Sequence, residues 1–305
     1  MLNLLSIVLL ISNFLLASTK QSKTPYIIVL GIAQDGGIPH ANCIKKCCKN
    51  EWGKKKSEKV SCIGLIDPRS NQSWLFDSTP DFPEQHYTIT SKHKTKLEGI
   101  FLTHAHIGHY SGLMYLGREV MGAKMINVFA MPKMFSFINN NGPWNQLIRL
   151  NNISLKKIIA RKELKINDQL FVKPILVPHR DEYSETVSYQ IMGPNKSILY
   201  IPDIDKWSKW EEDILLKIKY VDLLLVDGTF FSADEIPNRD MSEIPHPLIL
   251  ESMDLFSSLS TKDRNKIFFI HLNHSNPAVK KNSAARNLIK SKRFNIAYEG
   301  MLFEL

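Results

Sequence analysis

The stretch LTHAHIGHYSG, residues 102–112, decides how this sequence is interpreted. It places His104, His106 and His109 close together in a chain that has only ten histidines, and the apolar run 99–102 leads into it. Side chains two positions apart on an extended segment point to the same side. His109 follows where we expect the chain to turn into a helix. The three imidazoles can therefore converge on one metal ion or on two neighbouring ions.

The same arrangement, an apolar strand that ends at a histidine or an aspartate, recurs along the chain. Further ends of this kind carry Asp77, His179, Asp203, Asp227 and His271. Enzymes gather polar groups at strand ends because the strands form a rigid frame. One such histidine alone is more simply a loop residue with surface partners, but the recurrence favours a zinc site. The elements form two similar halves that meet near residue 160, and residues 111–121 have helical spacing.

The composition is that of a globular protein, with 44% hydrophobic and 23% charged residues over 305 positions. This length is enough for one large domain or two small ones. The net charge is +9, but the lysines are scattered and no aromatic and basic residues interleave. We therefore expect no nucleic-acid partner. A basic surface is instead consistent with a small anionic substrate.

The first residues, MLNLLSIVLLISNFLLAS, are almost continuously apolar and break into TKQSK. The run is short for a membrane span and ends in small residues, which favours a secretory signal peptide, although no Lys or Arg precedes it. We predict a signal peptide over residues 1–20 and a single domain over residues 21–305, exported to the periplasm or secreted. The alternative is an uncleaved amino-terminal membrane anchor.

At this point the chain resembles a known family. The motif HAHIGH, residues 104–109, is similar to the HxHxDH signature of the metallo-β-lactamase fold. LVPHRDE, LYIPDID and FFIHLNH resemble the later metal-ligand motifs of that family, in the same order. The strings GIAQDGGIPHANC, LLVDGTFF and AYEGM resemble a narrower branch, which holds the pyrroloquinoline-quinone biosynthesis protein PqqB and the phosphodiesterase PhnP. The resemblance covers residues 26–305.

The resemblance implies an α/β fold of the αββα sandwich type, in which two β-sheets face each other with helices outside. It also implies a metal centre with Asp203 bridging two zinc ions. The first ion would be held by His104, His106 and His179, and the second by His109 and His271. A hydroxide formed from water between the ions would attack the substrate. His246 would assist the leaving group or bind the anion, and the alternative is a surface-loop histidine.

Gly108 departs from the signature, which has an aspartate at this position as a ligand of the second metal. Glycine has no side chain to give, so we expect the second site to bind its ion weakly. We also expect Gly108→Asp to raise the metal content there.

Cys43, Cys47 and Cys48 share one loop. Disulfides are the usual interpretation in an exported protein, but adjacent cysteines bridge only with strain and three thiols leave one over. The branch carries a structural zinc here, held by cysteines and a histidine near the carboxyl terminus, which would be His274. The spacing CxxxCC departs from the usual CxCxxC of the branch. The remaining cysteine, Cys62, is expected to be a buried core thiol.

Two functions follow from these patterns. The first is a zinc-dependent, PqqB-like hydrolase in which metal-bound hydroxide attacks a phosphodiester or other small anionic ester. The alternative is a non-hydrolytic PqqB-like protein that binds or oxidises a quinone-cofactor precursor. In either case Asp77 is expected to orient the ligand loops by hydrogen bonding, unless it only caps a turn.

Overall fold

A computed structural model describes residues 23–54, 58–236, 240 and 243–305. Two seven-stranded mixed sheets form its centre. The first sheet has the strand order β14 (Leu302–Glu304), β1 (Tyr26–Gly31), β2 (Cys62–Asp67), β3 (Gln72–Phe76), β4 (Lys96–Phe101), β5 (Ile126–Ala130), β6 (Ile153–Lys157). The second has the order β13 (Asn295–Ile296), β12 (Ile267–Ile270), β11 (Leu223–Asp227), β10 (Ser197–Ile201), β9 (Val187–Met192), β8 (Phe171–Leu176), β7 (Leu164–Lys165).

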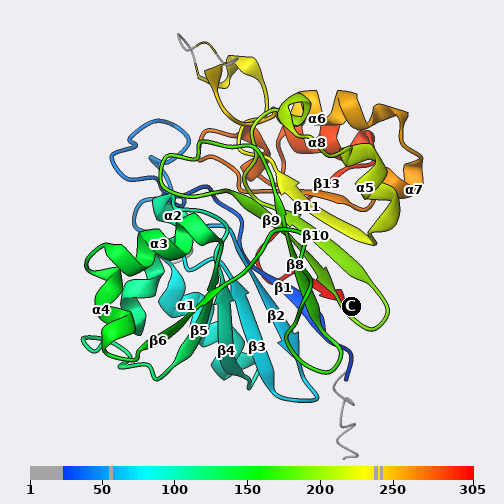
Figure 1. Ribbon diagram of the computed structural model, residues 1–305. Coiled ribbons are helices and arrows are strands. Elements are labelled where there is room, and N and C mark those ends of the chain that lie inside the picture. The colour runs from blue at the N-terminus through cyan, green and yellow to red at the C-terminus, as the bar shows by residue number, and fades with distance from the viewer. Residues whose placement is uncertain (1–22, 55–57, 237–239, 241–242) are drawn as a thin grey trace, which may run out of the picture.

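Helices cover the outer faces of both sheets (Figure 1). The helices of the first half are α1 (Phe82–Tyr87), α2 (Ile107–Tyr110), α3 (Pro132–Asn140) and α4 (Trp144–Arg149). Those of the second half are α5 (Ile214–Tyr220), α6 (Ile249–Leu255), α7 (Thr261–Arg264) and α8 (Ala284–Ser291). The arrangement confirms the predicted αββα sandwich. The two halves also meet near residue 160, as the sequence predicts, because β6 ends at Lys157 and β7 begins at Leu164.

The strands are apolar on both faces because both faces are buried. On β1, Ile27 and Val29 pack in the core between the two sheets, whereas Ile28 and Leu30 pack under the helices of the first half. Successive side chains of a strand point to opposite faces, so a strand between two apolar layers reads as a continuous apolar run. The runs recognised in the sequence have this origin.

Parallel pairing brings the polar strand ends to one edge. β3, β4 and β5 are parallel neighbours in the first sheet, and β10, β11 and β12 are parallel neighbours in the second. Their carboxyl ends therefore lie at the same edge of each sheet, and the loops that follow them carry the histidines and aspartates.

The structure corrects the helix expected over residues 111–121. The chain forms the short helix α2 and then a 3₁₀ segment, Ser111–Leu116. Gly112 packs against the Thr79 carbonyl so closely that an added Cβ would lie 2.1 Å from that oxygen. The tight contact holds this segment, and with it His109, against the end of β3.

The predicted signal peptide, residues 1–20, lies outside the described residues, and it stays a prediction. Within the described part of the chain, no helix has both the length and the apolar character needed to cross a membrane.

One buried hydrogen bond joins the two sheets next to the histidine motif. The hydroxyl of Tyr189 on β9 donates to the Leu102 carbonyl at 2.5 Å. Tyr189 is fully buried, and its ring meets Phe76 and Phe101 edge-on. The hydrogen bond fixes the end of β4 just before His104.

We expect Tyr189→Phe to lower the free energy of unfolding by about 1–2 kcal/mol, because a buried carbonyl loses its donor. Urea denaturation measures the change. Tyr220→Phe is the matched control, since Tyr220 is 76% exposed and should tolerate the substitution. Equal stability of the two variants would contradict the structural role of this hydrogen bond.

Candidate metal centre

Three histidines and one aspartate form the first group of possible metal ligands. His104 and His106 follow β4, His179 follows β8, and Asp203 follows β10. His104 Nε2 lies 2.8 Å from His106 Nδ1, and His179 Nε2 lies 3.3 Å from the same nitrogen. The Asp203 carboxylate lies 3.4 Å from His104 Nε2 and 3.3 Å from His179 Nε2. One donor atom from each of the four residues therefore lies within 4.8 Å of the other three, around a common centre.

A second group consists of Asp35, His109 and His271. Asp35 lies in the loop after β1, His109 on α2, and His271 directly after β12. His109 Nε2 is 3.4 Å from Asp35 Oδ1. Asp203 Oδ2 lies 3.5 Å from His109 Nε2 and 3.6 Å from His271 Nε2, so this carboxylate faces both groups.

Sequence reasoning missed Asp35, and the structure corrects the conclusion drawn from Gly108. The second group does contain a carboxylate, because Asp35 lies beside Gly108 and faces His109. The premise that this group lacks a carboxylate of its own is therefore wrong, and the gain expected from Gly108→Asp loses its structural basis. The only signal in the sequence was the position of Asp35 in GIAQDGG, directly after the first buried strand.

The electrostatics suit a divalent cation. Burial lowers the pKa of His104, His179 and His271, so these imidazoles are neutral, which is the form that binds metal. Burial alone would raise the pKa of Asp203, but its electrostatic interactions with the surrounding imidazoles and its hydrogen bond with His104 outweigh burial and hold this pKa well below its usual range. These three imidazoles therefore offer neutral nitrogens around an ionised carboxylate. His109 differs from them, because the charge of Asp77 and hydrogen bonds with neighbouring carboxylates outweigh burial and raise its pKa well above the usual range.

Several buried atoms in the two groups have no hydrogen-bond partner among the described residues. Those that face the groups are Asp35 Oδ1, His109 Nε2, Asp203 Oδ1 and His271 Nε2. Unpaired buried polar atoms are costly, so such a cluster calls for an explanation. Imidazole nitrogens with carboxylate oxygens fit zinc or another divalent metal ion.

Hydrogen bonds from outside the groups orient the imidazoles of the first half. The Thr103 hydroxyl donates to Asp77 at 2.9 Å and therefore accepts from His104 Nδ1 at 3.0 Å. His109 Nδ1 donates to Asp77 at 2.7 Å. Both rings thus leave Nε2 free for a metal ion, and Asp77 has the orienting position that the sequence predicts.

The second half of the chain contains the same arrangement of hydrogen bonds. The Thr229 hydroxyl donates to Asp227 at 2.7 Å and accepts from His271 Nδ1 at 3.0 Å. Glu182 orients the ring of His106. Its carboxylate accepts a hydrogen bond from Nε2 at 3.1 Å, so Nδ1 faces the donor group. Glu182 was not recognised in the sequence, because nothing local marks it.

His246 lies in the same buried cluster, so its interpretation as a surface-loop residue is wrong. Its Nδ1 donates to Asp227 at 2.8 Å and lies 3.2 Å from Asp203. Burial lowers the pKa of His246, but the charges of Asp227 and Asp203 outweigh this and raise it to about 9. His246 is therefore a cation at neutral pH, unlike His104, His179 and His271.

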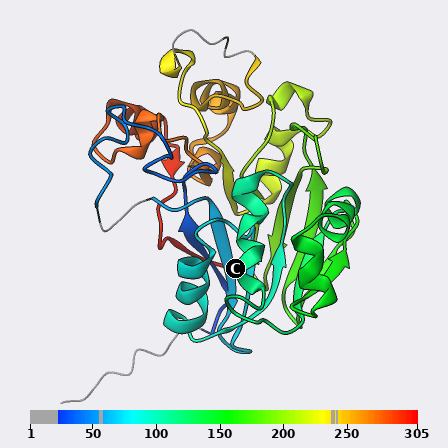
Figure 2. The ribbon, with the colours of Figure 1, turned by 90° about the vertical axis from the view of Figure 1, so that its left-hand side faces the viewer.

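A separate group of donors consists of Cys43, Cys47, Cys48 and His274, whose donor atoms all lie within 4.8 Å of one another. All four cysteines of the chain are free thiols, and Cys62 is buried in β2 as expected. Figure 2 shows the loop after β1, in blue, beside the orange carboxyl-terminal segment. The structure thus brings together the residues that the resemblance assigns to a structural zinc, a closed cysteine and histidine site.

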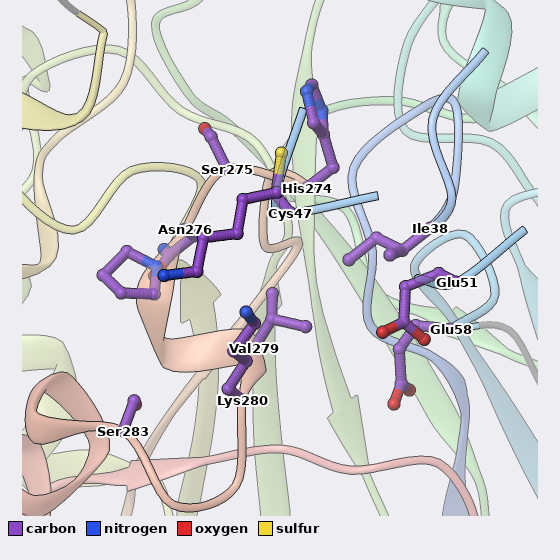
Figure 3. Close-up of a pocket in the computed structure, with 12 residues that line it drawn as sticks. Ile38, Cys47, Glu51, Glu58, His274, Ser275, Asn276, Val279, Lys280 and Ser283 are labelled. Atoms are coloured by element: carbon purple, nitrogen blue, oxygen red, sulfur yellow. The ribbon is translucent and has the colours of Figure 1, made fainter. Parts of the chain in front are cut away.

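The thiol group adjoins a cavity of about 450 Å³. Cys47 and His274 lie at one side of this cavity, and Glu51 and Glu58 at another (Figure 3). Burial lowers the pKa of His274, and its Nδ1 has no hydrogen-bond partner among the described residues. His274 is therefore a neutral donor available to a metal ion.

Comparison with known proteins places these groups in a family. Residues 73–272 match the profile of the Beta-lactamase superfamily domain. Coenzyme PQQ synthesis protein B of Methylorubrum extorquens (strain PA1) is 22% identical over 312 residues, which cover 92% of this chain and 100% of that protein. The crystal structure of zinc-bound PqqB from Methylobacterium extorquens aligns with a TM-score of 0.77 and 20% identity, over 92% of this chain and 100% of that one. A diphosphatase from the PhnP family aligns with a TM-score of 0.65 and 17% identity, over 92% and 97%.

We expect His274→Ala to remove about one zinc ion per chain and to lower the Tm by roughly 5 °C or more, because a structural zinc contributes folding free energy directly. Metal analysis and thermal denaturation measure the two effects. His86→Ala is the control, since His86 is a partly buried histidine on α1, outside both donor groups. A Cys43 disulfide detected by mass spectrometry in the native protein would contradict the prediction.

Proposed function

The chain belongs to the β-lactamase superfamily, with a metallo-β-lactamase fold of the PqqB- and PhnP-like branch, and we propose that it is a zinc-dependent hydrolase of a phosphodiester or other small anionic ester. The observation that carries the proposal is the convergence of His104, His106, His179 and Asp203 on one point. Imidazole ligands of this kind are typical of catalytic zinc, whereas structural zinc is mostly held by cysteines.

The residues of this chain divide the work. Zinc, when bound, supplies Lewis acidity and makes water a nucleophile near neutral pH. His104, His106 and His179 would hold the ion through ring nitrogens, and Asp203 would offset its charge. Asp77 and Glu182 keep the ring nitrogens in the required orientation through the hydrogen bonds described above.

His246 is suited to act on the substrate. Because its Nδ1 is engaged by Asp227, the Nε2–H is the donor that remains. A cationic imidazole with a pKa of about 9 can bind an anionic group or protonate a leaving oxygen. This supports the role for His246 that the resemblance implies.

Three observations support an anionic substrate. The Arg180 guanidinium lies 3.5 Å from His106 Nε2, so a fixed positive charge stands at the rim of the donor group. The chain as a whole carries a net charge of +9. A structural neighbour from the PhnP family is a diphosphatase, which is consistent with a phosphate ester as the substrate.

We further propose that the protein works after export, or anchored by residues 1–20.

The second candidate is a non-hydrolytic PqqB-like role in which the metal centre binds or oxidises a quinone-cofactor precursor. It is favoured by the relatives named coenzyme PQQ synthesis protein B, which match 92% of the chain. The two candidates differ in whether an ester bond is broken.

Turnover of a substrate panel separates them. Chelator-treated protein should be inactive, and added Zn²⁺ should restore hydrolysis of bis(p-nitrophenyl) phosphate or of a nucleotide diphosphate ester, with no action on a β-lactam. His104→Ala should remove this activity together with the zinc. If the zinc-loaded protein cleaves no phosphodiester, diphosphate ester or lactone but binds an aromatic ortho-quinone, the non-hydrolytic role replaces the proposal.

His246→Gln tests the assignment of the proton donor. Glutamine retains a hydrogen bond to Asp227 but carries no transferable proton, so kcat should fall about 10²-fold or more while zinc content stays unchanged. Steady-state kinetics and metal analysis provide the readout, with His86→Gln as the control. An unaltered kcat would remove His246 from the mechanism.

A further inference from the structure

Residue 108 and residue 35 occupy the same place in the metal centre. An ideal Cβ added to Gly108 would lie 2.3 Å from Asp35 Oδ1 and 2.5 Å from Asp35 Cα. The backbone as well as the side chain of Asp35 fills the space into which a side chain at 108 would extend. A carboxylate can therefore come from one of these positions but not from both.

We propose that Asp35 has taken over the metal-ligand role of the aspartate that the HxHxDH signature carries at position 108, and that a second ion is held by Asp35, His109, His271 and Asp203. The proposal rests on the proposed metal centre and extends it. Glycine at position 108 is then required because it leaves room for Asp35, and the second metal site is retained.

The donor atoms support this assignment. Asp35 Oδ1, His109 Nε2 and His271 Nε2 lie within 4.8 Å of one another, and none has a hydrogen-bond partner among the described residues. Asp203 Oδ2 is 3.5 Å from His109 Nε2 and 3.6 Å from His271 Nε2. Two imidazole nitrogens and two carboxylate oxygens make a four-donor set that zinc accepts.

The backbone fixes Asp35 beside His271. Gln34 N donates to the Leu272 carbonyl at 2.9 Å, and Leu272 N donates to the Ile32 carbonyl at 2.7 Å. The residues adjoining the two ligands are thus paired like neighbouring strands. Immediately after Asp35 the chain turns at Gly37, which has a φ of +70°. The loop therefore presents the carboxylate from a rigid frame, as a metal ligand requires.

His271 also carries a backbone feature that is common at functional sites. Its φ is 62°, in the left-handed region that non-glycine residues rarely adopt. The hydrogen bonds of Leu272 hold this conformation, and it directs the imidazole toward Asp203 and His109. Strained backbone of this kind persists where the surrounding structure over-determines it.

Metal stoichiometry tests the exchange with three variants of the full-length protein. Asp35→Asn retains the volume but not the charge, and it should lose about one zinc ion per chain relative to the wild type, or bind it at least about tenfold more weakly. Gly108→Asp should lower the Tm because its side chain collides with Asp35. Gly108→Ala places its Cβ in the same contact with Asp35 Cα but adds no carboxylate, so it should lower the Tm without raising the zinc content.

Chelator competition measures the affinity, and the zinc-dependent rise in Tm gives a second readout. Asp234→Asn is the matched control, since this exposed aspartate lies outside the donor groups and should leave the metal count unchanged. Wild-type zinc content and affinity in Asp35→Asn would overturn the proposal, as would a wild-type protein with one ion at the histidine centre. Because neither readout depends on turnover, loss of an ion in Asp35→Asn supports the exchange even if the protein hydrolyses no ester.

Discussion

The buried carboxylate of Asp203 constrains how the two sheets and their histidines are arranged. It is 2% exposed, and its oxygens lie 3.2–3.6 Å from nitrogens of five histidines, namely His104, His109, His179, His246 and His271. A buried charge is tolerated only when it is compensated. Here the compensation comes from both sheets, so the facing of the two sheets and the convergence of the imidazoles are parts of one arrangement.

Each half of the chain orients an imidazole ring through the same series of hydrogen bonds. A strand ends at an aspartate, the aspartate accepts from a threonine hydroxyl, and that hydroxyl accepts from a histidine Nδ1. Asp77 and Thr103 do this in the first half, and Asp227 and Thr229 in the second. The orientation of each ring is thereby set before any metal binds. Each half also has one histidine that contacts the aspartate directly, namely His109 at Asp77 and His246 at Asp227.

The two clusters of possible metal ligands share their segments. The loop after β1 carries Asp35 toward the histidine centre and Cys43, Cys47 and Cys48 toward the thiol group. The segment after β12 carries His271 to the first and His274 to the second. The thiol group therefore joins the same two stretches of backbone that present ligands to the histidine centre, so a zinc ion bound by the thiols would help to position those ligands.

The strand ends, the division near residue 160 and the clustered histidines could be predicted from the sequence because they are local patterns. The αββα sandwich and the set of metal ligands followed from the resemblance of its motifs to a known family. The thiol cluster was visible in the sequence, and the hydrogen bonds of Asp77 are consistent with the orienting role predicted for it. Only the tertiary structure decided that Asp35 stands at Gly108, that Glu182 holds His106, and that β14 closes the first sheet. These contacts join segments far apart in the chain, and a missing side chain gives no sign of which distant residue fills its place. The space beside Gly108 exists only once β1 and α2 have packed together, so only the folded chain could reveal its occupant.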